Sequence, residues 1–154
     1  MKNDGGFTYI GLLAVIIIIG VMTAVVGRTW RATSRIEKET ELLWTGHQFR
    51  RAIKAYYNYG KDHYGSASYP AELKDLLVDP RSGGTHRYLR KIYPDPMTGK
   101  KDWGLITDVS QHIIGVHSLS EGKTLKRDNF DLEDEGFKGK EKYSEWAFIV
   151  VPSQ

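Results

Sequence analysis

An uninterrupted apolar run near the N-terminus constrains this chain more than any other feature. No charged residue occurs between Asp4 and Arg28, and the run from Phe7 to Val26 contains 20 residues. As a helix, a run of this length extends about 30 Å, which matches the hydrocarbon thickness of a bilayer. A lone segment in lipid must satisfy its own backbone hydrogen bonds, and only a helix does so. The run therefore predicts a membrane-spanning helix.

Three fates of this segment have to be weighed. A secretory signal peptide has an apolar region of roughly 7–15 residues and then a small-x-small cleavage site. The run here is longer, and residues 24–26 offer only a poor site, so we favour an anchor that stays with the protein. The third fate is cleavage ahead of the run, which the sequence Gly5-Gly6-Phe7 suggests.

The pattern beyond the apolar run predicts that the same helix continues. No proline occurs before Pro70, and apolar residues recur at steps of seven, four and three, a spacing typical of an amphipathic helix. We predict one helix from about Phe7 to about Asn58, ended by Gly60 and Gly65. Its predicted buried stripe contains Leu42, Gly46, Phe49, Ile53 and Tyr56.

The remaining residues predict a small mixed domain. The stretch YPAELKDLLVDP predicts a loop and then a short helix with Leu73, Leu76 and Leu77 on one side. A turn at Pro94, Pro96 and Gly99 precedes the first strand. The strands are expected at 103–107, 112–118 and 145–151, in an antiparallel sheet covered by the amphipathic half of the long helix. The fold class is therefore α+β. We divide the chain into residues 1–6, 7–27 (the spanning half of the helix), 28–59 (its amphipathic half) and 60–154 (the globular region).

Charge and motif content argue against several functions. Residues 28–59 carry 7 Lys and Arg against 3 Asp and Glu, whereas residues 60–154 carry 14 against 15. The positive excess therefore follows the anchor, and no nucleic-acid partner is expected. The chain has no cysteine, no histidine pair with zincin spacing and no GxSxG nucleophile motif, and we predict that it is not an enzyme.

Two groups of side chains leave alternatives open. The acidic segment with Asp128, Asp131, Glu133, Asp134 and Glu135 has ligands that suit calcium, but its spacing matches no defined loop, and a solvated loop is the favoured interpretation. No other cofactor is expected. The aromatic residues, favoured as core where helix and sheet meet rather than as a stacking surface, are Tyr56, Tyr57, Tyr59, Tyr64, Tyr69, Trp44 and Trp103.

The stretches GG-FTYIGLL and YLRKIYPDPMTGKKDWGLI carry a resemblance to a known family. A polar leader ending in glycine, then Phe-Thr, then an apolar helix followed by an amphipathic one and a small sheet, resembles the type IV pilin superfamily. The chain is most similar to the pseudopilins of type II secretion systems, in which an Asp-Pro turn enters the first strand. The resemblance covers the whole chain and implies a pilin-like fold.

The resemblance implies a processing step at the N-terminus. A membrane aspartyl peptidase, the prepilin peptidase, would cut between Gly6 and Phe7 and methylate the new amine, so that residues 1–6 are a leader peptide. Gly6 has no Cβ, which lets an extended chain lie close against a peptidase. The partners implied are this peptidase, other pseudopilins and the inner-membrane secretion platform.

Topology is a point on which charge and resemblance disagree. Arg28, Arg31 and Arg35 follow the anchor directly, and the positive-inside rule would place the globular region in the cytoplasm. The resemblance instead implies a single-pass protein of the bacterial inner membrane with its globular region in the periplasm, and we follow the resemblance. The acidic block Glu37, Glu39 and Glu41 and a second basic block, Arg50, Arg51 and Lys54, follow the three arginines. The favoured interpretation of these charges is a solvated helix face with lipid-headgroup contacts, and the alternative is pairing of basic and acidic blocks between neighbouring subunits.

One position departs from the family pattern. Most members carry a glutamate at the fifth mature position, where its carboxylate pairs with the N-terminal amine of a neighbour, and this chain has Gly11 there. An unpaired charge in an apolar core is costly, so that pair guides docking. We therefore place Thr8, Gly11 and the three arginines among the assembly residues of a minor or atypical pseudopilin. The alternatives are a minor pilin of a surface or DNA-uptake pilus, and an anchored periplasmic binding protein that never polymerises.

Overall fold

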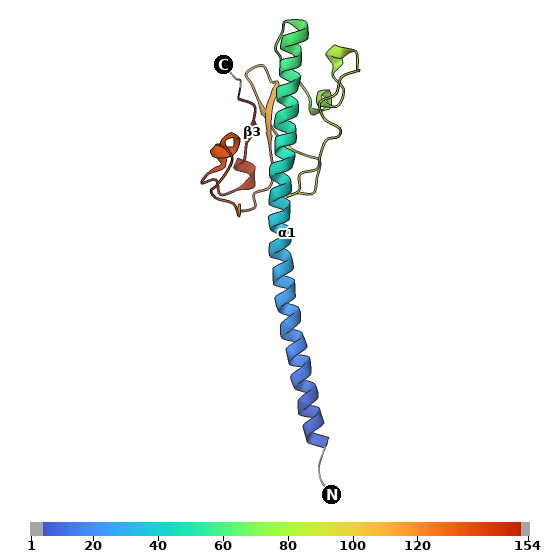
Figure 1. Cartoon of the computed structure of the whole chain (residues 1–154), viewed down its shortest axis with the longest axis vertical. Helices are drawn as coiled ribbons and strands as arrows, with labels where there is room; N and C mark the ends of the chain where they lie inside the picture. The colour runs from blue at the N-terminus through green and yellow to red at the C-terminus, as the bar shows by residue number, and fades with distance from the viewer. Residues whose placement is uncertain (1–4, 152–154) are drawn as a thin grey trace. The chain divides into compact units, whose positions relative to one another are not determined.

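The computed structural model describes residues 5–151, and within its long helix it describes the side chains of residues 9–20, 22 and 33–64. That helix is α1 (Gly5–Tyr64) (Figure 1). The chain divides into two compact units, which we call the N-terminal unit (Met1–Glu37) and the C-terminal unit (Lys38–Gln154) and describe separately.

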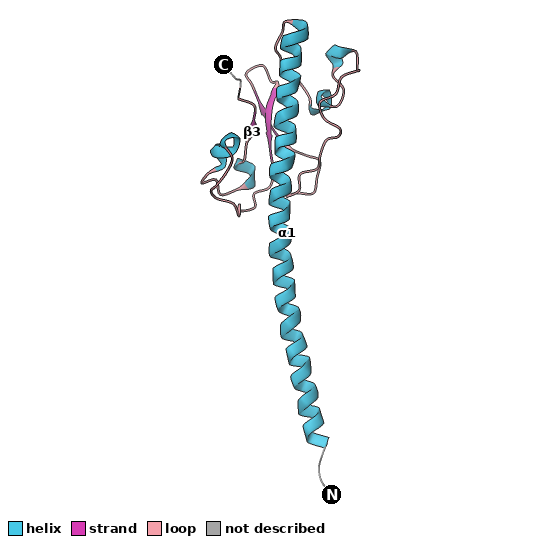
Figure 2. Ribbon diagram, in the orientation of Figure 1, coloured by secondary structure: helices cyan, strands magenta, loops and turns pink. Residues whose placement is uncertain are grey.

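The C-terminal unit has an α+β architecture. Its part of α1 packs against a three-stranded antiparallel sheet of β1 (Gly104–Thr107), β2 (Ile113–His117) and β3 (Phe148–Ile149), in the order β1-β2-β3 (Figure 2). Short 3-10 helices occupy the connections, at η1 (Leu73–Leu76), η2 (Pro80–Ser82), η3 (Leu132–Phe137) and η4 (Tyr143–Glu145). The predicted fold class, a long helix on a small antiparallel sheet, is thus confirmed at this level.

The predicted apolar stripe of α1 is the face that enters the core. Leu42, Phe49 and Ile53 are fully buried and Tyr56 nearly so, because residues three, four or seven apart lie on one side of a helix. Opposite them the sheet and the connections contribute Trp103, Ile113, Val116, Phe137, Tyr143, Trp146 and Phe148. The hydrophobic effect of this shared core attaches the helix to the sheet.

The end of α1 differs from the prediction at Gly60. The helix continues past this residue to Tyr64, and Gly65 adopts a left-handed φ of 63°, which ends the helix. Gly60 instead is buried in a close contact, since a Cβ there would lie against the guanidinium of Arg81 and the carbonyl oxygen of Ser66. Gly46 has a similar role on the core face, where any Cβ would overlap the ring of Phe148.

The last strand is shorter than predicted. Residues 145–151 were expected to be extended, but only Phe148 and Ile149 pair with β2, opposite Val116 and Gly115. The preceding 3-10 turn η4 and the packing of Trp146, which is fully buried, take up the start of this segment. The short helix predicted within YPAELKDLLVDP is likewise only the 3-10 turn η1, in which Leu76 is fully buried.

The Asp-Pro turn is attached to the sheet through a buried carboxylate. Asp95 is fully buried, and its oxygens accept hydrogen bonds from the Ser118 hydroxyl at 2.7 Å and the Met97 amide at 2.9 Å. Gly99 has a φ of 72°, as its predicted position at the exit of the turn requires. The turn is thereby held next to the end of β2.

Candidate functional site

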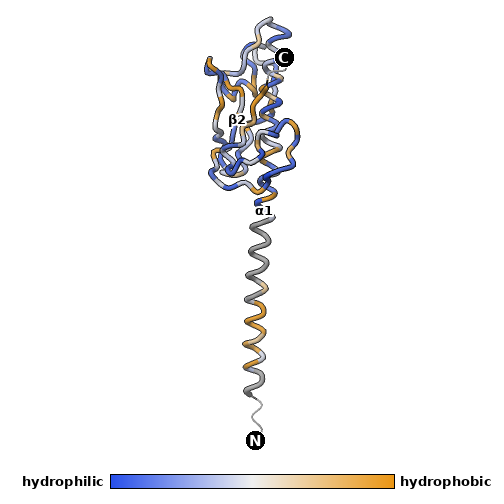
Figure 3. Tube along the Cα trace, turned by 90° about the vertical axis from the view of Figure 1, so that its left-hand side faces the viewer, coloured by the Kyte–Doolittle hydropathy of each residue, from blue (hydrophilic) through white to orange (hydrophobic). Residues whose placement is uncertain are grey.

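The apolar surface of α1 in the N-terminal unit is the strongest candidate for a functional site. Ten large hydrophobic side chains there are between 42% and 68% exposed: Tyr9, Ile10, Leu12, Leu13, Val15, Ile16, Ile17, Ile18, Ile19 and Met22. Figure 3 colours the described part of this segment mostly as hydrophobic. Consecutive residues on a helix point about 100° apart, so residues 15–19 alone cover its whole circumference. Water is an unfavourable environment for every side of this segment.

The size of that penalty follows from the hydrophobic effect. Fully burying one such side chain contributes about 1.5–3 kcal/mol, so removing ten half-exposed ones from water contributes on the order of 10 kcal/mol. That figure is comparable with the whole stability of a small domain. The exposed apolar surface of this segment is therefore more stable when it is removed from water.

Gly11 lies within this apolar surface. Apart from the adjacent residues and the backbone of the helix itself, no described atom lies within 4 Å of the position a Cβ would occupy there. Without a side chain, Gly11 offers no carboxylate to a neighbouring amine.

Within the described residues, no helix combines the length and the hydropathy that crossing a membrane requires.

The other predicted N-terminal residues are mostly outside the described side chains. Gly6, Phe7, Thr8, Arg28 and Arg31 fall within the bounds of α1, and their side chains are not described. The leader residues 1–4 are also outside the described part. Arg35 is described and exposed, and its predicted role in assembly stays a prediction.

The two charge blocks predicted for contacts between neighbouring helices are partly internal to this chain. Glu39 is buried, and its carboxylate accepts hydrogen bonds from the Leu125 and Lys126 amides and, at 2.7 Å, from the Tyr143 hydroxyl. Arg50 is also buried and donates to Asp134 at 2.8 Å. Neither residue is therefore available for a neighbouring subunit, and the prediction was wrong for these two.

The acidic segment contains a buried carboxylate and is not uniformly solvated. Asp134 is 2% exposed and accepts from His47 Nε2 at 2.6 Å as well as from Arg50. Burial alone would raise the pKa of Asp134, but the hydrogen bonds from His47 and Arg50 outweigh it and hold the pKa below its ordinary value. In the part of the chain that the structure describes, no group of three or more His, Asp or Glu side chains is arranged to hold a metal ion.

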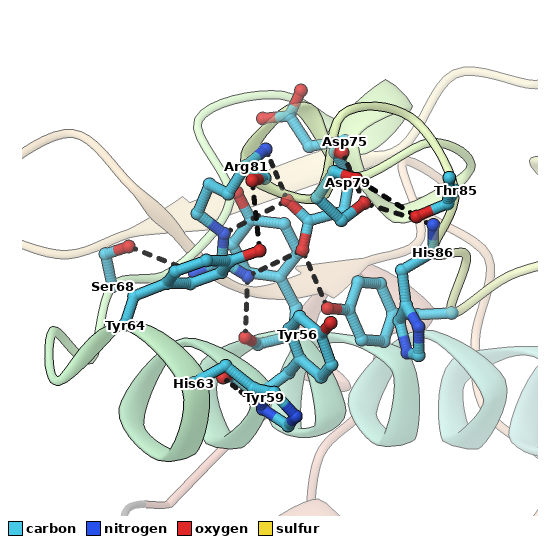
Figure 4. A network of polar contacts seen from close by, with 12 residues as sticks. Tyr56, Tyr59, His63, Tyr64, Ser68, Asp75, Asp79, Arg81, Thr85 and His86 are labelled. Atoms are coloured by element: carbon cyan, nitrogen blue, oxygen red, sulfur yellow. Dashed lines mark hydrogen bonds and ion pairs between the residues drawn. The ribbon is translucent and has the colours of Figure 1, made fainter.

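Another buried acid, Asp79, lies beside the C-terminal end of α1. Asp79 is fully buried and receives hydrogen bonds from the Arg81 side chain and amide and, at 2.7 Å, from the Tyr88 hydroxyl (Figure 4). The guanidinium of Arg81 lies 3.6 Å from the centre of the Tyr56 ring and donates to the Tyr56 carbonyl. Burial would raise the pKa of Asp79, yet the Arg81 and Tyr88 donors lower it on balance. This network attaches residues 79–88 to the helix.

The aromatic residues follow the predicted core role only in part. Tyr56 and Trp103 are buried, whereas Trp44 is 49% exposed with its ring edge against Tyr93, and Tyr64 is 45% exposed. Tyr59 lies between two stacked imidazoles, His63 and His86, with ring centres 4.0 and 4.3 Å away. The rings of Tyr59, His63 and His86 lie beside the Arg81 network (Figure 4).

Sequence reasoning missed Asp79 and Arg81 and placed Glu39, Arg50 and Asp134 at the surface. The partners of Glu39, Arg50 and Asp134 lie between 83 and 104 residues away, whereas Asp79 accepts from Arg81 and Tyr88, two and nine residues away. A local signal existed only for Asp79, whose Asp-Pro sequence is typical of a 3-10 start.

Comparisons with known proteins give no assignment, since no family model, curated protein or solved structure matches the chain.

The buried Asp134 predicts how the stability of the C-terminal unit changes in acid. Its pKa in the folded state is below the ordinary value of 3.8, so its contribution is complete above that pH and is lost as the pH falls below it. Asp134→Asn should lower the free energy of unfolding at pH 7 and should lose less further stability than the wild type between about pH 5 and pH 3. Urea unfolding at several pH values, followed by tryptophan fluorescence, measures both quantities.

Asp131→Asn is the matched control, since Asp131 is an exposed carboxylate of the same segment whose side chain makes no capping hydrogen bond. This variant should follow the wild-type pH dependence. Parallel curves for Asp134→Asn and the wild type over this range would contradict the assignment.

Proposed function

We propose that the protein is a structural pseudopilin subunit of a type II secretion system. The observation that carries the proposal is the apolar surface of residues 9–22, which is exposed on every side of one continuous helix. Such a segment is stable in lipid, and it is equally stable when packed among apolar helices of the same kind. A subunit that leaves the bilayer for a helical filament core needs both properties.

The proposed sequence of events follows from the resemblance and from this surface. The chain is inserted in the bacterial inner membrane with its C-terminal unit in the periplasm, and prepilin peptidase removes residues 1–6. The mature helix, beginning with Phe7-Thr8, then joins a short periplasmic filament that drives protein export. Lipid phosphates contact Arg28, Arg31 and Arg35 before assembly.

Gly11 gives the subunit a particular place in this scheme. A subunit without a carboxylate at this point cannot neutralise the terminal amine of a neighbour through that pair. We therefore assign it a minor or priming position, where packing of the apolar surface alone guides docking. The exposed apolar side chains around Gly11 support this assignment.

Mapping the mature N-terminus is the experiment that tests the proposal most directly. The full chain is expressed with prepilin peptidase, and the intact mass is measured after extraction with a non-ionic detergent. We expect a chain that begins at Phe7 and carries one added methyl group. Gly6→Leu should leave residues 1–6 attached, because a bulky side chain prevents close approach to the peptidase.

Disulfide crosslinking adds a readout of assembly, since the chain has no cysteine of its own. Ile16→Cys should form oxidised dimers in cells that assemble the filament, whereas Val109→Cys, fully exposed in the C-terminal unit, should form few. A chain that begins beyond Val26 would refute the proposal. An unprocessed chain without Ile16 crosslinks would favour an anchored binding protein.

A further inference from the structure

A groove runs along α1 on the side where the sheet ends. Three adjoining cavities of about 350, 60 and 280 Å³ make it up, and neighbouring cavities share lining residues. Arg51 and Glu133 belong to two of the cavities, and Lys54 and Val151 also belong to two. The groove therefore follows one stripe of the helix, with residues 131–133 and 149–151 on its other side.

The edge strand of the sheet contributes to this groove. Within the described sheet, β3 pairs with β2 and has no strand on its other side (Figure 2). Phe148 pairs with Val116, and the Val150 amide donates to the Ile114 carbonyl at 2.9 Å, so the backbone groups of these two residues point toward β2. By the alternation of an antiparallel ladder, the groups of Ile149 and Val151 point away from β2.

Two backbone groups are thereby left for an added strand. The Ile149 amide donates to the Ala147 carbonyl at 3.0 Å, which leaves the Ile149 carbonyl and the Val151 amide directed outward. A carbonyl and an amide two residues apart form the pairing unit that an extended peptide uses when it joins a sheet edge. Exposed edges of this kind are sites at which another chain pairs.

The charge of the groove indicates what kind of chain it accepts. Arg51, Lys54 and Lys61 are exposed, and among the described residues no carboxylate forms an ion pair with them. The acidic residues that line the groove are Asp131 and Glu133. A carboxylate oxygen of Glu133 lies 3.5 Å from Nη1 of Arg50, which already forms an ion pair with Asp134. Leu132 and Val151 add apolar surface that is 91% and 78% exposed.

We propose that this groove binds an acidic, extended segment of another protein, which adds as a strand to β3 with its carboxylates against Arg51, Lys54 and Lys61. A second copy of this chain is a poor occupant. Its own acidic segment forms the 3-10 helix η3 and buries Asp134, so that segment is not available as an extended strand. The groove lies within the C-terminal unit, and this function does not depend on filament assembly.

Binding of a synthetic acidic peptide tests the proposal. The probe is the capped pentapeptide Glu-Val-Asp-Val-Glu, titrated into the full chain in non-ionic detergent at low salt and followed by calorimetry. The same peptide with lysine in place of each acid should bind at least about tenfold more weakly, because like charges then meet. Raising the salt concentration should weaken the binding of the acidic peptide, since exposed charges are screened.

Variants of the groove identify where the peptide binds. Lys54→Glu should lower the affinity for the acidic peptide about tenfold, and Arg51→Glu should also lower this affinity. Lys101→Glu is the matched control, because Lys101 is an exposed lysine outside the groove, and it should change affinity less than about twofold. Bound peptide should also slow hydrogen exchange at the Val151 amide, which an ionic contact alone would not do.

Several results would overturn the proposal. Equal affinity for the acidic and basic peptides would remove the charge argument, and an unchanged affinity in Lys54→Glu would place the peptide elsewhere. Unchanged exchange at Val151 in the saturated complex would exclude strand addition. Absence of peptide binding together with self-association that Lys54→Glu abolishes would show that a second copy occupies the groove.

Discussion

Asp79→Ala should destabilise the C-terminal unit by about 3–5 kcal/mol, the usual cost of removing one partner from a buried ion pair. The carboxylate is fully buried and is the acceptor for the Arg81 guanidinium, the Arg81 amide and the Tyr88 hydroxyl. Its loss leaves the Arg81 charge partly buried above the Tyr56 ring without an anion. Chemical denaturation followed by tryptophan fluorescence gives the free energy of unfolding, because Trp103 and Trp146 are core residues.

Asp102→Ala provides the control for this change, since Asp102 is an exposed carboxylate for which the structure gives no ion pair. It should alter the free energy of unfolding by less than about 0.5 kcal/mol. The double variant Asp79→Ala/Arg81→Ala should be less destabilised than the sum of the two single variants, because the unpaired charge is then absent. A loss below about 1 kcal/mol for Asp79→Ala would show that the network does not stabilise the unit.

Gly46→Ala should reverse the usual effect of replacing a helical glycine. In an open helix, alanine is favoured over glycine by roughly 0.5–1 kcal/mol. Here the added Cβ would overlap the ring of Phe148, which is fully buried and cannot turn into solvent. We expect a net loss of about 1–3 kcal/mol in the free energy of unfolding, as for other overpacked cores.

Gly11→Ala is the matched control, since it adds the same methyl group to the same helix at a point with no atom within 4 Å. It should leave the free energy of unfolding of the C-terminal unit unchanged. Adding Phe148→Leu to Gly46→Ala should recover part of the loss, because the smaller side chain makes room for the methyl group. A Gly46→Ala protein as stable as the wild type would mean that the sheet can move away from the helix at little cost.

The helix and its buried stripe were predictable because they depend on local spacing. Leu42, Phe49, Ile53 and Tyr56 follow the 3.6-residue period, and each is buried as expected. The last strand was predicted too long. The aromatic and β-branched residues of 145–151 favour a strand locally. Trp146, which directly follows the 3-10 turn η4, instead packs fully buried in the core. The propensity was present, and tertiary packing overrode it.

The charged residues were the least predictable part of the candidate sites. The sequence around Glu39 and Arg50 favours a solvated helix face, with pairing between subunits as the alternative, yet both residues are buried against the segment 124–134. The groove also could not be predicted, because its basic stripe and its strand edge lie about 100 residues apart in the chain. Only folding brings the two sides together.

The sequence by itself determined three properties. These are an apolar segment that is unfavourable in water, a helix that continues from that segment, and the stripe of apolar residues that this helix buries in the core. These properties depend on residues within a few turns of one another. The tertiary structure alone decided which carboxylates become internal acceptors, Glu39, Asp79, Asp95 and Asp134 among them. The physical reason is that burying a charge is costly unless hydrogen-bond donors surround it. The donors to Glu39 and Asp134 come from segments more than 80 residues away, and the sequence does not record which segments meet.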